Sequence, residues 1–534
     1  MGDPTATDRD LVHRYRETPF PTGAGGVRSV LDHLDRHARE RGREPYLTTP
    51  AADGTERTLT YAELDHYSRR TAHWLDTVLG LPAGGPVGLT PVNDVPSVIA
   101  LFAVLRSGRP ALVLNPADPA ARVTEQTAAL AVEAIVTGPA TADDRFPRTV
   151  RAPDPERLPD PPPGWSPPSP RPEADMLYFG TSGSTAASKL VAQTHGNAVA
   201  NADAMVRHHG LRPGDTFLGC LPVHHVNGVH LTLMATLAAG AHAVLAPGFD
   251  PFRYPELLTL HRPRVASVVP SILDALSAVW RRRTLPADFS HFVTAAAPLS
   301  AETARAVHTR IGARVLQGYG LTETTNFSTT MPRDIGDDAY RRLLLDADIP
   351  TVGVAVPGNE VAVFAPEGRR ARPGEPGEIR MRGHNVMSRY AGNAEATAEA
   401  FAGGWFHSQD LGHEVLDEKT GHTYFVITGR SKNIAKVRGE AVSLEEMERA
   451  LRRLPGVLDA ACAAVPDPLL GEVVAVALNA PDAVGDDAVR THLQAHFAEA
   501  VQPHRILRVP EVPRTATGKI LRPALRDLLA QPPR

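Results

Sequence analysis

The chain has 534 residues, of which 42% are hydrophobic and 22% charged, and its formal net charge is -4. That length exceeds what one hydrophobic core usually organises, so more than one domain is expected. The small negative charge disfavours a nucleic-acid or anionic-membrane partner, and no apolar run is long enough to span a bilayer. The first residues lack the basic and apolar regions of a secretion signal, which predicts a cytoplasmic protein.

Short apolar strands alternate with helices along the first part of the chain. A helix is expected over 27–41, and residues 58–64 are typical of a strand that passes into a helix. A buried helix at 98–105 precedes another strand at 111–114. This alternation indicates a parallel-sheet α/β architecture. Prolines then concentrate over 153–172, which predicts a stiff connector.

The stretch Thr181–Lys189 follows the next apolar strand, 176–179, and combines small hydroxyl residues, a glycine and a lysine. Small residues let backbone N–H groups approach an anion, hydroxyls add donors, and a lysine adds a point charge. The spacing is not that of a Walker loop. The stretch predicts a phosphate-binding loop, and a mobile Ser/Thr-rich surface loop is the alternative.

Lysine is rare in this chain. Of the 56 basic residues 51 are arginine, and lysine occurs only at positions 189, 419, 432, 436 and 519. Because an ammonium and a guanidinium are not interchangeable, a lysine retained against this bias indicates a site that needs a compact charge. We interpret Lys419, which lies in a polar turn, as an ordinary surface residue. The other four are candidate functional residues.

Two later segments also place side chains that could bind a ligand at the ends of expected strands. The segment Cys220–Gly228 contains the pair His224 and His225. Adjacent side chains rarely converge on one metal ion, so a substrate cavity is favoured over a metal site, with ordinary packing as the alternative. The segment Gly318–Thr324 presents an aromatic ring, a hydroxyl and a carboxylate where ligands of α/β sheets bind.

Taken together, these segments resemble the adenylate-forming superfamily, which includes acyl- and aryl-CoA ligases, luciferases and adenylation domains of peptide synthetases. The resemblance covers about residues 27–527, and its motifs follow the family's order: Thr58–Leu64, Ala100–Pro116, Thr181–Lys189, Gly318–Thr324, Gly404–Gly412, Gly429–Glu448 and Pro513–Lys519. It implies an α/β fold with a large multi-subdomain N-terminal domain of parallel sheets, 1–431. A small mobile α+β C-terminal domain, 432–534, would rotate about a hinge at Lys432.

The resemblance implies a two-step reaction that uses ATP and Mg²⁺. A small carboxylic acid attacks the α-phosphorus of ATP and releases pyrophosphate, and a thiol then takes the acyl group from the acyl-adenylate. Coenzyme A is the leading acceptor, and a freestanding ligase that loads the phosphopantetheine of an acyl carrier protein is the first alternative. A biosynthetic variant that uses an unusual nucleophile such as nitrite, for diazotisation, comes next. An inactive nucleotide-binding scaffold is the remote alternative.

The resemblance also implies which residues bind the nucleotide. Those assigned to the β- and γ-phosphates are Thr181, Ser182, Gly183, Ser184, Thr185 and Lys189. Tyr319 would stack on adenine next to Ala297, and Thr322 would contact the α-phosphate. Glu323 would hold Mg²⁺ as a hard oxygen ligand.

The remaining assignments concern the residues that bind the ribose and the acid, and the lysines of the mobile C-terminal domain and its hinge. Asp410 would bind the ribose hydroxyls with help from Arg430, and Lys519 would bridge the carboxylate and the α-phosphate. Lys436 would act in the second conformation or line the adenylate, and Lys432 would be the hinge. The acid pocket would be formed by His225, Asn227, Gly228, Ala295, Ala296 and Gly318.

Three positions depart from the family pattern. Ala186-Ala187-Ser188 stands where the family usually has Gly-x-Pro, Ala295–Pro298 where it has Gly-Gly-Ala-Pro, and Gln409 where glycine is frequent. Alanine disfavours positive φ, and added methyl groups are expected to narrow the space near adenine or the acyl group. The charged residues are retained, so adenylation remains the prediction, while the substrate and the second step stay open.

Overall fold

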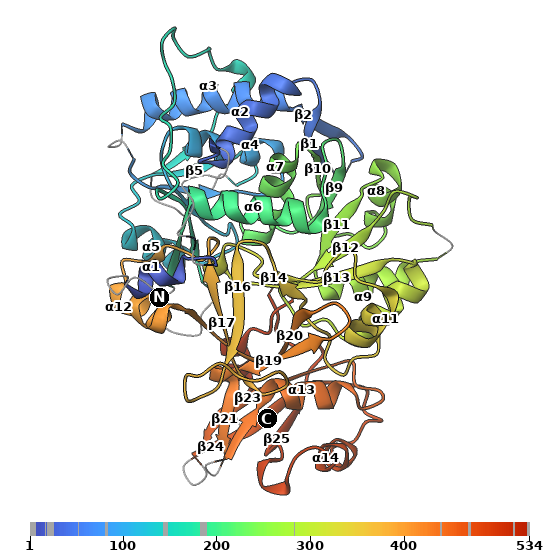
Figure 1. The fold of residues 1–534 in the computed structure, drawn as a ribbon. Coiled ribbons are helices and arrows are strands. Elements are labelled where there is room, and N and C mark those ends of the chain that lie inside the picture. Colours follow the sequence, from blue (N-terminus) through green and yellow to red (C-terminus); the bar gives the residue numbers. More distant parts are fainter. Residues whose placement is uncertain are drawn as a thin grey trace. The chain divides into compact units, whose positions relative to one another are not determined.

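A computed structural model describes residues 7–16, 18, 26–51, 53–80, 84–141, 148–181, 189–281, 284–437, 440–467, 471–515 and 518–530. The chain divides into two compact units (Figure 1). The first contains Met1–Val361 and Met381–His407, and the second contains Ala362–Arg380 and Ser408–Arg534. The second unit thus includes strands that precede residue 432. The boundary predicted there concerns motion about Lys432, and it stays a prediction.

A nine-stranded sheet runs through the first unit (Figure 1). In sheet order its strands are β15 (Val354–Ala355), β14 (Thr329–Thr330), β13 (Arg314–Tyr319), β12 (His291–Thr294), β11 (Val265–Val268), β9 (Thr216–Gly219), β10 (His242–Leu245), β1 (Pro45–Pro50) and β2 (Glu56–Thr60). Neighbouring strands from β13 to β1 are parallel, so their carboxyl ends meet at one edge. Strands β11 and β12 are buried throughout, as expected for a parallel sheet.

A seven-stranded sheet forms the other layer of strands in this unit. In sheet order its strands are β18 (Arg389–Ala391), β8 (Leu190–Thr194), β7 (Asp175–Gly180), β4 (Ala111–Val113), β3 (Val87–Thr90), β5 (Ile135–Thr137) and β6 (Thr149–Arg151). The pairs from β7 to β6 are parallel, whereas β8 and β18 are antiparallel to their neighbours. The predicted phosphate loop therefore connects two antiparallel strands, β7 and β8.

The helices of the first unit follow the strands in the predicted alternation. They are α1 (Asp8–Val12), α2 (Val30–Glu40), α3 (Tyr61–Leu79), α4 (Val95–Arg106), α5 (Ala120–Ala129), α6 (His195–His209), α7 (Thr236–Ala239), α8 (Tyr254–His261), α9 (Pro270–Val279), α10 (Ala301–Ala306), α11 (Asp337–Tyr340) and α12 (Ala394–Ala400). Thr60 caps α3 reciprocally with Glu63, and Thr194 caps α6 with Asn197. These capping boxes let β2 and β8 pass directly into helices.

Shorter helical segments interrupt this pattern. They are η2 (Pro155–Arg157), η3 (Asn227–Ala235), η4 (Val307–Ile311), η5 (Thr322–Thr324), η6 (Arg341–Leu345) and η7 (Ala402–Gly404). Segment η3, which follows the predicted acid-pocket residue His225, is a π-helix, a rare form that often marks functional sites. None of the helices in the described ranges combines the length and apolar character that a bilayer crossing requires.

The second unit contains two smaller sheets. Most residues of a four-stranded sheet belong to it, in the order β16 (Asn359–Phe364), β17 (Gly377–Gly383), β19 (Phe406–Asp417) and β20 (His422–Arg430). The other sheet has the order β22 (Glu440–Ser443), β21 (Ile434–Val437), β24 (Gly471–Asn479) and β23 (Asp459–Asp467), with β25 (Arg505–Arg508) beside β24. Its helical segments are η8 (Ser431–Asn433), α13 (Leu444–Arg452), α14 (Asp486–Gln494), η9 (Glu499–Val501) and α15 (Arg522–Ala530). Met447, Leu451 and Val476 form part of its apolar core.

Candidate active site

The predicted acid-pocket and adenine residues follow neighbouring parallel strands of the nine-stranded sheet. Residues 220–228 follow β9, residues 295–298 follow β12, and the Gly-Tyr-Gly segment ends β13. Because β9, β11, β12 and β13 are successive parallel neighbours, these segments leave the sheet at the same edge. This edge is where open α/β sheets bind their ligands.

Two glycines flank Tyr319 because another segment packs directly on the backbone there. A Cβ atom at Gly318 would lie 2.5 Å from a ring carbon of Phe327, and one at Gly320 would lie 1.7 Å from the carbonyl oxygen of Asn326. Tyr319 itself is 8% exposed, and its carbonyl accepts from Ser328 N–H at 2.9 Å. The close approach fixes the position of the tyrosine at the sheet edge.

The loop that carries His225 is held by hydrogen bonds from neighbouring segments. Asn93 Oδ1 accepts from Val223 N–H at 2.9 Å, and Ser267 Oγ donates to Asn227 Oδ1 at 3.0 Å. A Cβ atom at Gly228 would lie 2.3 Å from the carbonyl oxygen of Pro222, so the loop requires glycine at this position. These contacts explain why an asparagine and a glycine follow the histidine.

The rings of the paired histidines pack against each other, and the two side chains are not part of a metal-binding group. The ring centroids of His224 and His225 are 4.8 Å apart with an interplanar angle of 51°. Burial lowers the pKa of His224 below its ordinary value. Across the described ranges, no group of three or more histidine, cysteine, aspartate or glutamate side chains is arranged to hold a metal ion.

Ala296 occupies a left-handed backbone conformation, with φ of +73°. The superfamily usually has glycine at this position, and the structure keeps the glycine-like backbone without glycine. An L-residue in this region costs roughly 1–2 kcal/mol. Ala296 is exposed and Ala295 is 9% exposed, so the methyl group of Ala296 projects into accessible space next to the sheet edge.

The turn that carries Thr322 and Glu323 is fixed by side chains from distant segments. Gln193 Nε2 donates to the Thr322 carbonyl at 2.8 Å, and Asn385 Nδ2 donates to the Thr324 carbonyl at 3.0 Å. His230 Nε2 bonds Gln193 Oε1 at 2.7 Å. Since Gln193 Oε1 can only accept, the proton of His230 lies on Nε2.

The same turn contains a strained residue. Thr325 has φ of +64°, and its hydroxyl donates to the Asn385 carbonyl at 2.6 Å. Positive φ in a β-branched residue is uncommon and persists where surrounding contacts determine the backbone. The contacts that hold this strained backbone also fix the turn that carries the Glu323 carboxylate.

Glu323 and Lys189 both contact Tyr390. The Tyr390 hydroxyl donates to Glu323 Oε1 at 3.0 Å, and Lys189 Nζ lies 4.8 Å from the centroid of the tyrosine ring. The structure thus brings together the predicted metal ligand and the predicted phosphate-loop lysine. A carboxylate of this kind suits Mg²⁺, which is usually held by one or two carboxylates together with substrate phosphates.

Both ends of the predicted phosphate loop are described, but not its centre. Thr181 N–H donates to the Lys189 carbonyl at 2.9 Å, and Arg122 Nη2 donates to the Thr181 carbonyl at 3.3 Å. These contacts close the base of the loop. The predicted phosphate-binding residues Ser182, Gly183, Ser184 and Thr185 lie outside the described residues.

In the second unit, Asp410 and Arg430 form an ion pair. They are direct cross-strand partners on β19 and β20, with Arg430 Nε 2.5 Å from Asp410 Oδ1. Asp410 is 2% exposed, and its N–H donates to Ser408 Oγ at 3.0 Å. Gln409, where the family often has glycine, has φ of +62°. The predicted ribose-binding pair is therefore preformed next to a second glycine-like position.

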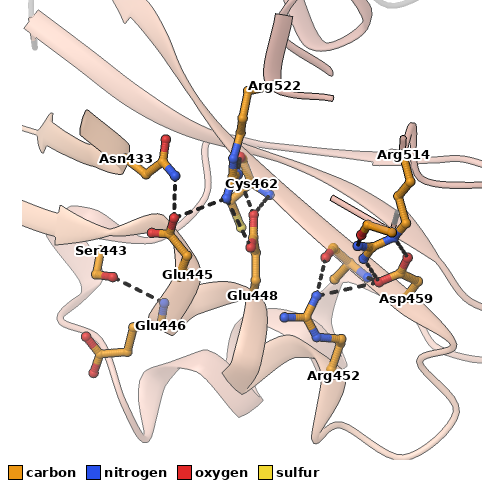
Figure 2. A network of polar contacts seen from close by, with 12 residues as sticks. Asn433, Ser443, Glu445, Glu446, Glu448, Arg452, Asp459, Cys462, Arg514 and Arg522 are labelled. Atoms are coloured by element: carbon orange, nitrogen blue, oxygen red, sulfur yellow. Dashed lines mark hydrogen bonds and ion pairs between the residues drawn. The ribbon is translucent and has the colours of Figure 1, made fainter. Parts of the chain in front are cut away.

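Lys519 lies on a tight turn that is closed by its own backbone (Figure 2 shows the arginine that supports it). Thr515 N–H donates to the Lys519 carbonyl at 2.8 Å, and Gly518 N–H donates to the Thr515 carbonyl at 2.8 Å. Arg514 forms two hydrogen bonds to Asp459 and donates from Nη1 to the Gly518 carbonyl at 2.7 Å. The side chain of Lys519 is exposed.

A partly buried network connects the segment next to the predicted hinge with helix α15 (Figure 2). Asn433 donates to Glu445, and Arg522 lies 3.5 Å from Glu445. Arg522 also pairs with Glu448, which is 2% exposed and accepts from Cys462 N–H at 2.8 Å. This network fixes the helix that begins three residues after Lys519. Lys432 lies in η8, and Lys436 is exposed on β21.

Several site residues were not predicted from the sequence. Tyr390, Gln193, Asn385 and His230 all contact, directly or through one neighbour, the turn that carries Glu323. Tyr390 and Gln193 lie in strands, Asn385 lies in a turn and His230 lies in the π-helical segment η3. In the sequence, the available signal was a polar or aromatic residue inside an otherwise apolar stretch. Their importance depends on contacts between segments that are far apart in the chain.

Comparisons with known proteins show the family and the fold of the chain. Residues 34–391 match the family described as AMP-binding enzyme, and residues 446–519 match its C-terminal domain. The sulfoacetate–CoA ligase of Cupriavidus necator is 33% identical over 451 residues, 83% of each chain. A feruloyl-CoA synthase of Amycolatopsis sp is 30% identical over 511 residues, which cover 91% of this chain and 97% of that protein.

Solved structures show the same fold. ATP-bound MatB from Rhodopseudomonas palustris has a TM-score of 0.79 at 26% identity, over 93% of this chain and 98% of that one. The amide bond synthetase McbA from Marinactinospora thermotolerans has a TM-score of 0.79 at 27% identity, over 93% and 99%. The predicted resemblance and the predicted α/β fold are confirmed. The chain therefore belongs to the AMP-binding enzyme family.

Proposed function

We propose that this enzyme adenylates a small carboxylic acid with ATP and transfers the acyl group to coenzyme A. The proposal rests on one observation in the first unit: Tyr390 contacts both the Glu323 carboxylate and the Lys189 ammonium. A carboxylate and an ammonium that contact the same side chain suit a substrate that is itself a metal–phosphate complex, because the carboxylate can bind the metal and the ammonium can bind the phosphates.

In the first step an oxygen of the carboxylate attacks the α-phosphorus of ATP. The bond between that phosphorus and the bridging oxygen to the β-phosphate breaks, and pyrophosphate leaves. Negative charge grows on the phosphate oxygens, so Lys189 would stabilise the leaving group and Lys519 the α-phosphate and the incoming carboxylate. Mg²⁺, held by Glu323, would supply further charge neutralisation when bound. Asp410 and Arg430 would orient the ribose.

In the second step a thiolate attacks the carbonyl carbon of the acyl-adenylate, the bond from that carbon to the AMP oxygen breaks, and AMP leaves. We propose that the C-terminal region, from about residue 432, rotates between the two steps about Lys432, with Lys436 serving the second one. His225, Asn227 and the residues after β12 would line the acid pocket. Similarity to CoA ligases for sulfoacetate and ferulate supports coenzyme A as the acceptor.

A second candidate is transfer to a nucleophile other than a thiol of coenzyme A. The similarity to an amide bond synthetase favours testing amines as acceptors, and a carrier-protein thiol is a proposal of the same kind. These acceptors differ from coenzyme A only in the second step, so the first step is tested first. Nitrite is a separate alternative, because it would replace the carboxylate in the attack on ATP, and an arylamine would then be the second nucleophile.

The test is pyrophosphate release from ATP and Mg²⁺ with panels of aliphatic, aromatic and amino acids, and with nitrite plus an arylamine. Release that depends on one acid class and disappears in Lys519→Ala supports adenylation and identifies the acid. Thioester formation with coenzyme A then separates the leading acceptor from a carrier protein or an amine. If no acid and no nitrite supports pyrophosphate release while ATP still binds, the proposal is overturned in favour of an inactive scaffold.

A further inference from the structure

Tyr390 contacts two residues of the proposed ATP site at once, one through its ring and one through its hydroxyl. Lys189 Nζ lies 4.8 Å from the centroid of the ring, within the range of a cation–π interaction. The hydroxyl donates to Glu323 Oε1 at 3.0 Å. Lys189 and Glu323 carry opposite charges and come from segments far apart in the chain, so one aromatic side chain links them.

The strand pairing determines where the ring lies. Tyr390 is the middle residue of β18 and pairs with Val191 of β8, and Lys189 immediately precedes β8. Side chains on neighbouring positions of paired strands lie within reach of an aromatic ring. Tyr390 N–H also donates to Thr397 Oγ1 of α12 at 3.0 Å, and the tyrosine is 7% exposed. Its ring therefore has little freedom to move.

Glu323 is held twice by the segment that carries Tyr390. Met387 N–H donates to the Glu323 carbonyl at 2.7 Å, while the phenol donates to the carboxylate. Burial, together with the adjacent Glu323 carboxylate, raises the pKa of Tyr390 well above its ordinary value, so the hydroxyl stays a donor. Both the backbone and the side chain of Glu323 are thus fixed relative to β18.

We propose that Tyr390 is a positioning residue that sets the Glu323 carboxylate and the Lys189 ammonium in place for the metal and phosphates of MgATP. The proposal rests on the proposed function, because that function makes these two groups part of the ATP site. A hydrogen bond to a metal-binding carboxylate orients the ligand and tunes its affinity. A ring face attracts an ammonium without supplying a hydrogen-bond acceptor atom, so the ammonium keeps N–H donors for phosphate oxygens.

The first test uses Tyr390→Phe, which removes the hydroxyl and keeps the ring. Mn²⁺ binding to the enzyme–ATP complex, followed by electron paramagnetic resonance, is expected to weaken about tenfold, the lower end of the usual effect of such partners. The Mg²⁺ concentration for half-maximal pyrophosphate release should rise by a similar factor. ATP binding without a divalent metal, measured by calorimetry, should stay unchanged because Lys189 keeps its ring contact.

The second variant, Tyr390→Leu, also removes the ring. It should weaken metal-free ATP binding by about fivefold in addition, the factor expected for a partly buried cation–π contact. Tyr178→Phe is the matched control, because the Tyr178 hydroxyl donates to Asp175 Oδ2 at 2.7 Å from β7 of the same sheet. This control loses the same type of hydrogen bond and should leave both binding constants unchanged.

A double-mutant cycle with Glu323→Gln completes the test. If the phenol acts through the carboxylate, Tyr390→Phe adds no further loss of Mn²⁺ affinity in the Glu323→Gln background. Additive losses would overturn the proposal, as would wild-type Mn²⁺ affinity in a folded Tyr390→Phe variant or equal losses in Tyr390→Phe and Tyr178→Phe. A wild-type enzyme that binds Mn²⁺ and ATP but releases no pyrophosphate would contradict the proposed function, and the metal-binding comparison would still decide the role of Tyr390.

Discussion

Arg514 and Asp459 form a two-pronged ion pair that supports the turn carrying Lys519 (Figure 2). Arg514 Nε lies 3.0 Å from Asp459 Oδ2, and Nη2 lies 2.9 Å from Oδ1. The third nitrogen of the guanidinium, Nη1, donates to the Gly518 carbonyl at 2.7 Å. One planar group thus connects the start of β23 with the residue before the lysine, a geometry that an ammonium could not reproduce.

Replacing Arg514 should therefore impair adenylation even though its guanidinium is not proposed to touch substrate. We expect Arg514→Met to lower acid-dependent pyrophosphate release by roughly tenfold to a hundredfold, because a small displacement of a catalytic group has effects of that size. Arg508→Met is the control, since Arg508 pairs with Asp486 at 2.7 Å in the same unit. Equal rates in the two variants would contradict a positioning role for Arg514.

Lys519→Ala should abolish most adenylation while the protein stays folded. Loss of a single charge at a developing anion typically costs about a hundredfold or more in rate. Lys519→Arg should not restore activity, because the broader guanidinium cannot occupy the place of a compact ammonium. Lys419→Ala removes an exposed lysine from the β19–β20 turn and should have no effect. Near-normal pyrophosphate release by Lys519→Ala would refute the assignment.

Ala296→Gly should raise the thermal stability of the protein. The positive φ of Ala296 destabilises the folded protein by roughly 1–2 kcal/mol, and glycine removes this cost. The greater conformational freedom of glycine in the unfolded chain offsets about 0.4–1 kcal/mol of the gain. The expected net effect is a stabilisation of up to about 1.6 kcal/mol, visible as a higher melting temperature. Ala297→Gly, at a neighbouring position without positive φ, should lower the melting temperature instead. A fall in both variants would argue against strain at Ala296.

Acidification should destabilise the first unit through its buried histidines. Burial, with the nearby positive charges of Arg264 and Arg333, lowers the pKa of His291 to about 3. Between the unfolded pKa, about 6.5, and that value, the unfolded chain binds a proton that the folded protein does not. The free energy of unfolding should therefore fall as the pH falls through this range.

The contribution of His291 is at most about 1.4 kcal/mol per pH unit. Chemical denaturation between pH 6 and pH 4 measures it. His291→Asn removes the titrating group and should flatten the pH dependence by up to this amount, whatever its effect on stability at neutral pH. An unchanged slope in His291→Asn would show that the histidine titrates equally in both states.

Local sequence patterns predicted most of the strands and helices near the site. The strand at 176–179 corresponds to β7, and the buried helix expected at 98–105 lies within α4. These elements were predictable because apolar runs and capping residues act within a few positions of the chain. Segment η3 is π-helical up to Ala235, and the periodicity of apolar residues alone does not distinguish such a widened turn from an α-helix.

The sequence also indicated which charged residues to examine. The rarity of lysine singled out Lys189 and Lys519, and the motif order indicated the family, which the comparisons confirmed. The departures at Ala296 and Gln409 were visible as missing glycines, yet their backbone conformations were not. Both keep positive φ, because neighbouring segments fix the backbone whichever residue stands there.

Local patterns and the order of the motifs thus predicted the order of elements, the family and the residue types of the site. The side chains that support these residues became known only from the way distant segments pair. Tyr390 reaches Glu323 because β18 pairs with β8, and Arg514 supports the Lys519 turn because β23 presents Asp459 beside it. Contacts of this kind depend on strand pairing between distant segments, and a local pattern carries no record of which distant segment will lie alongside it.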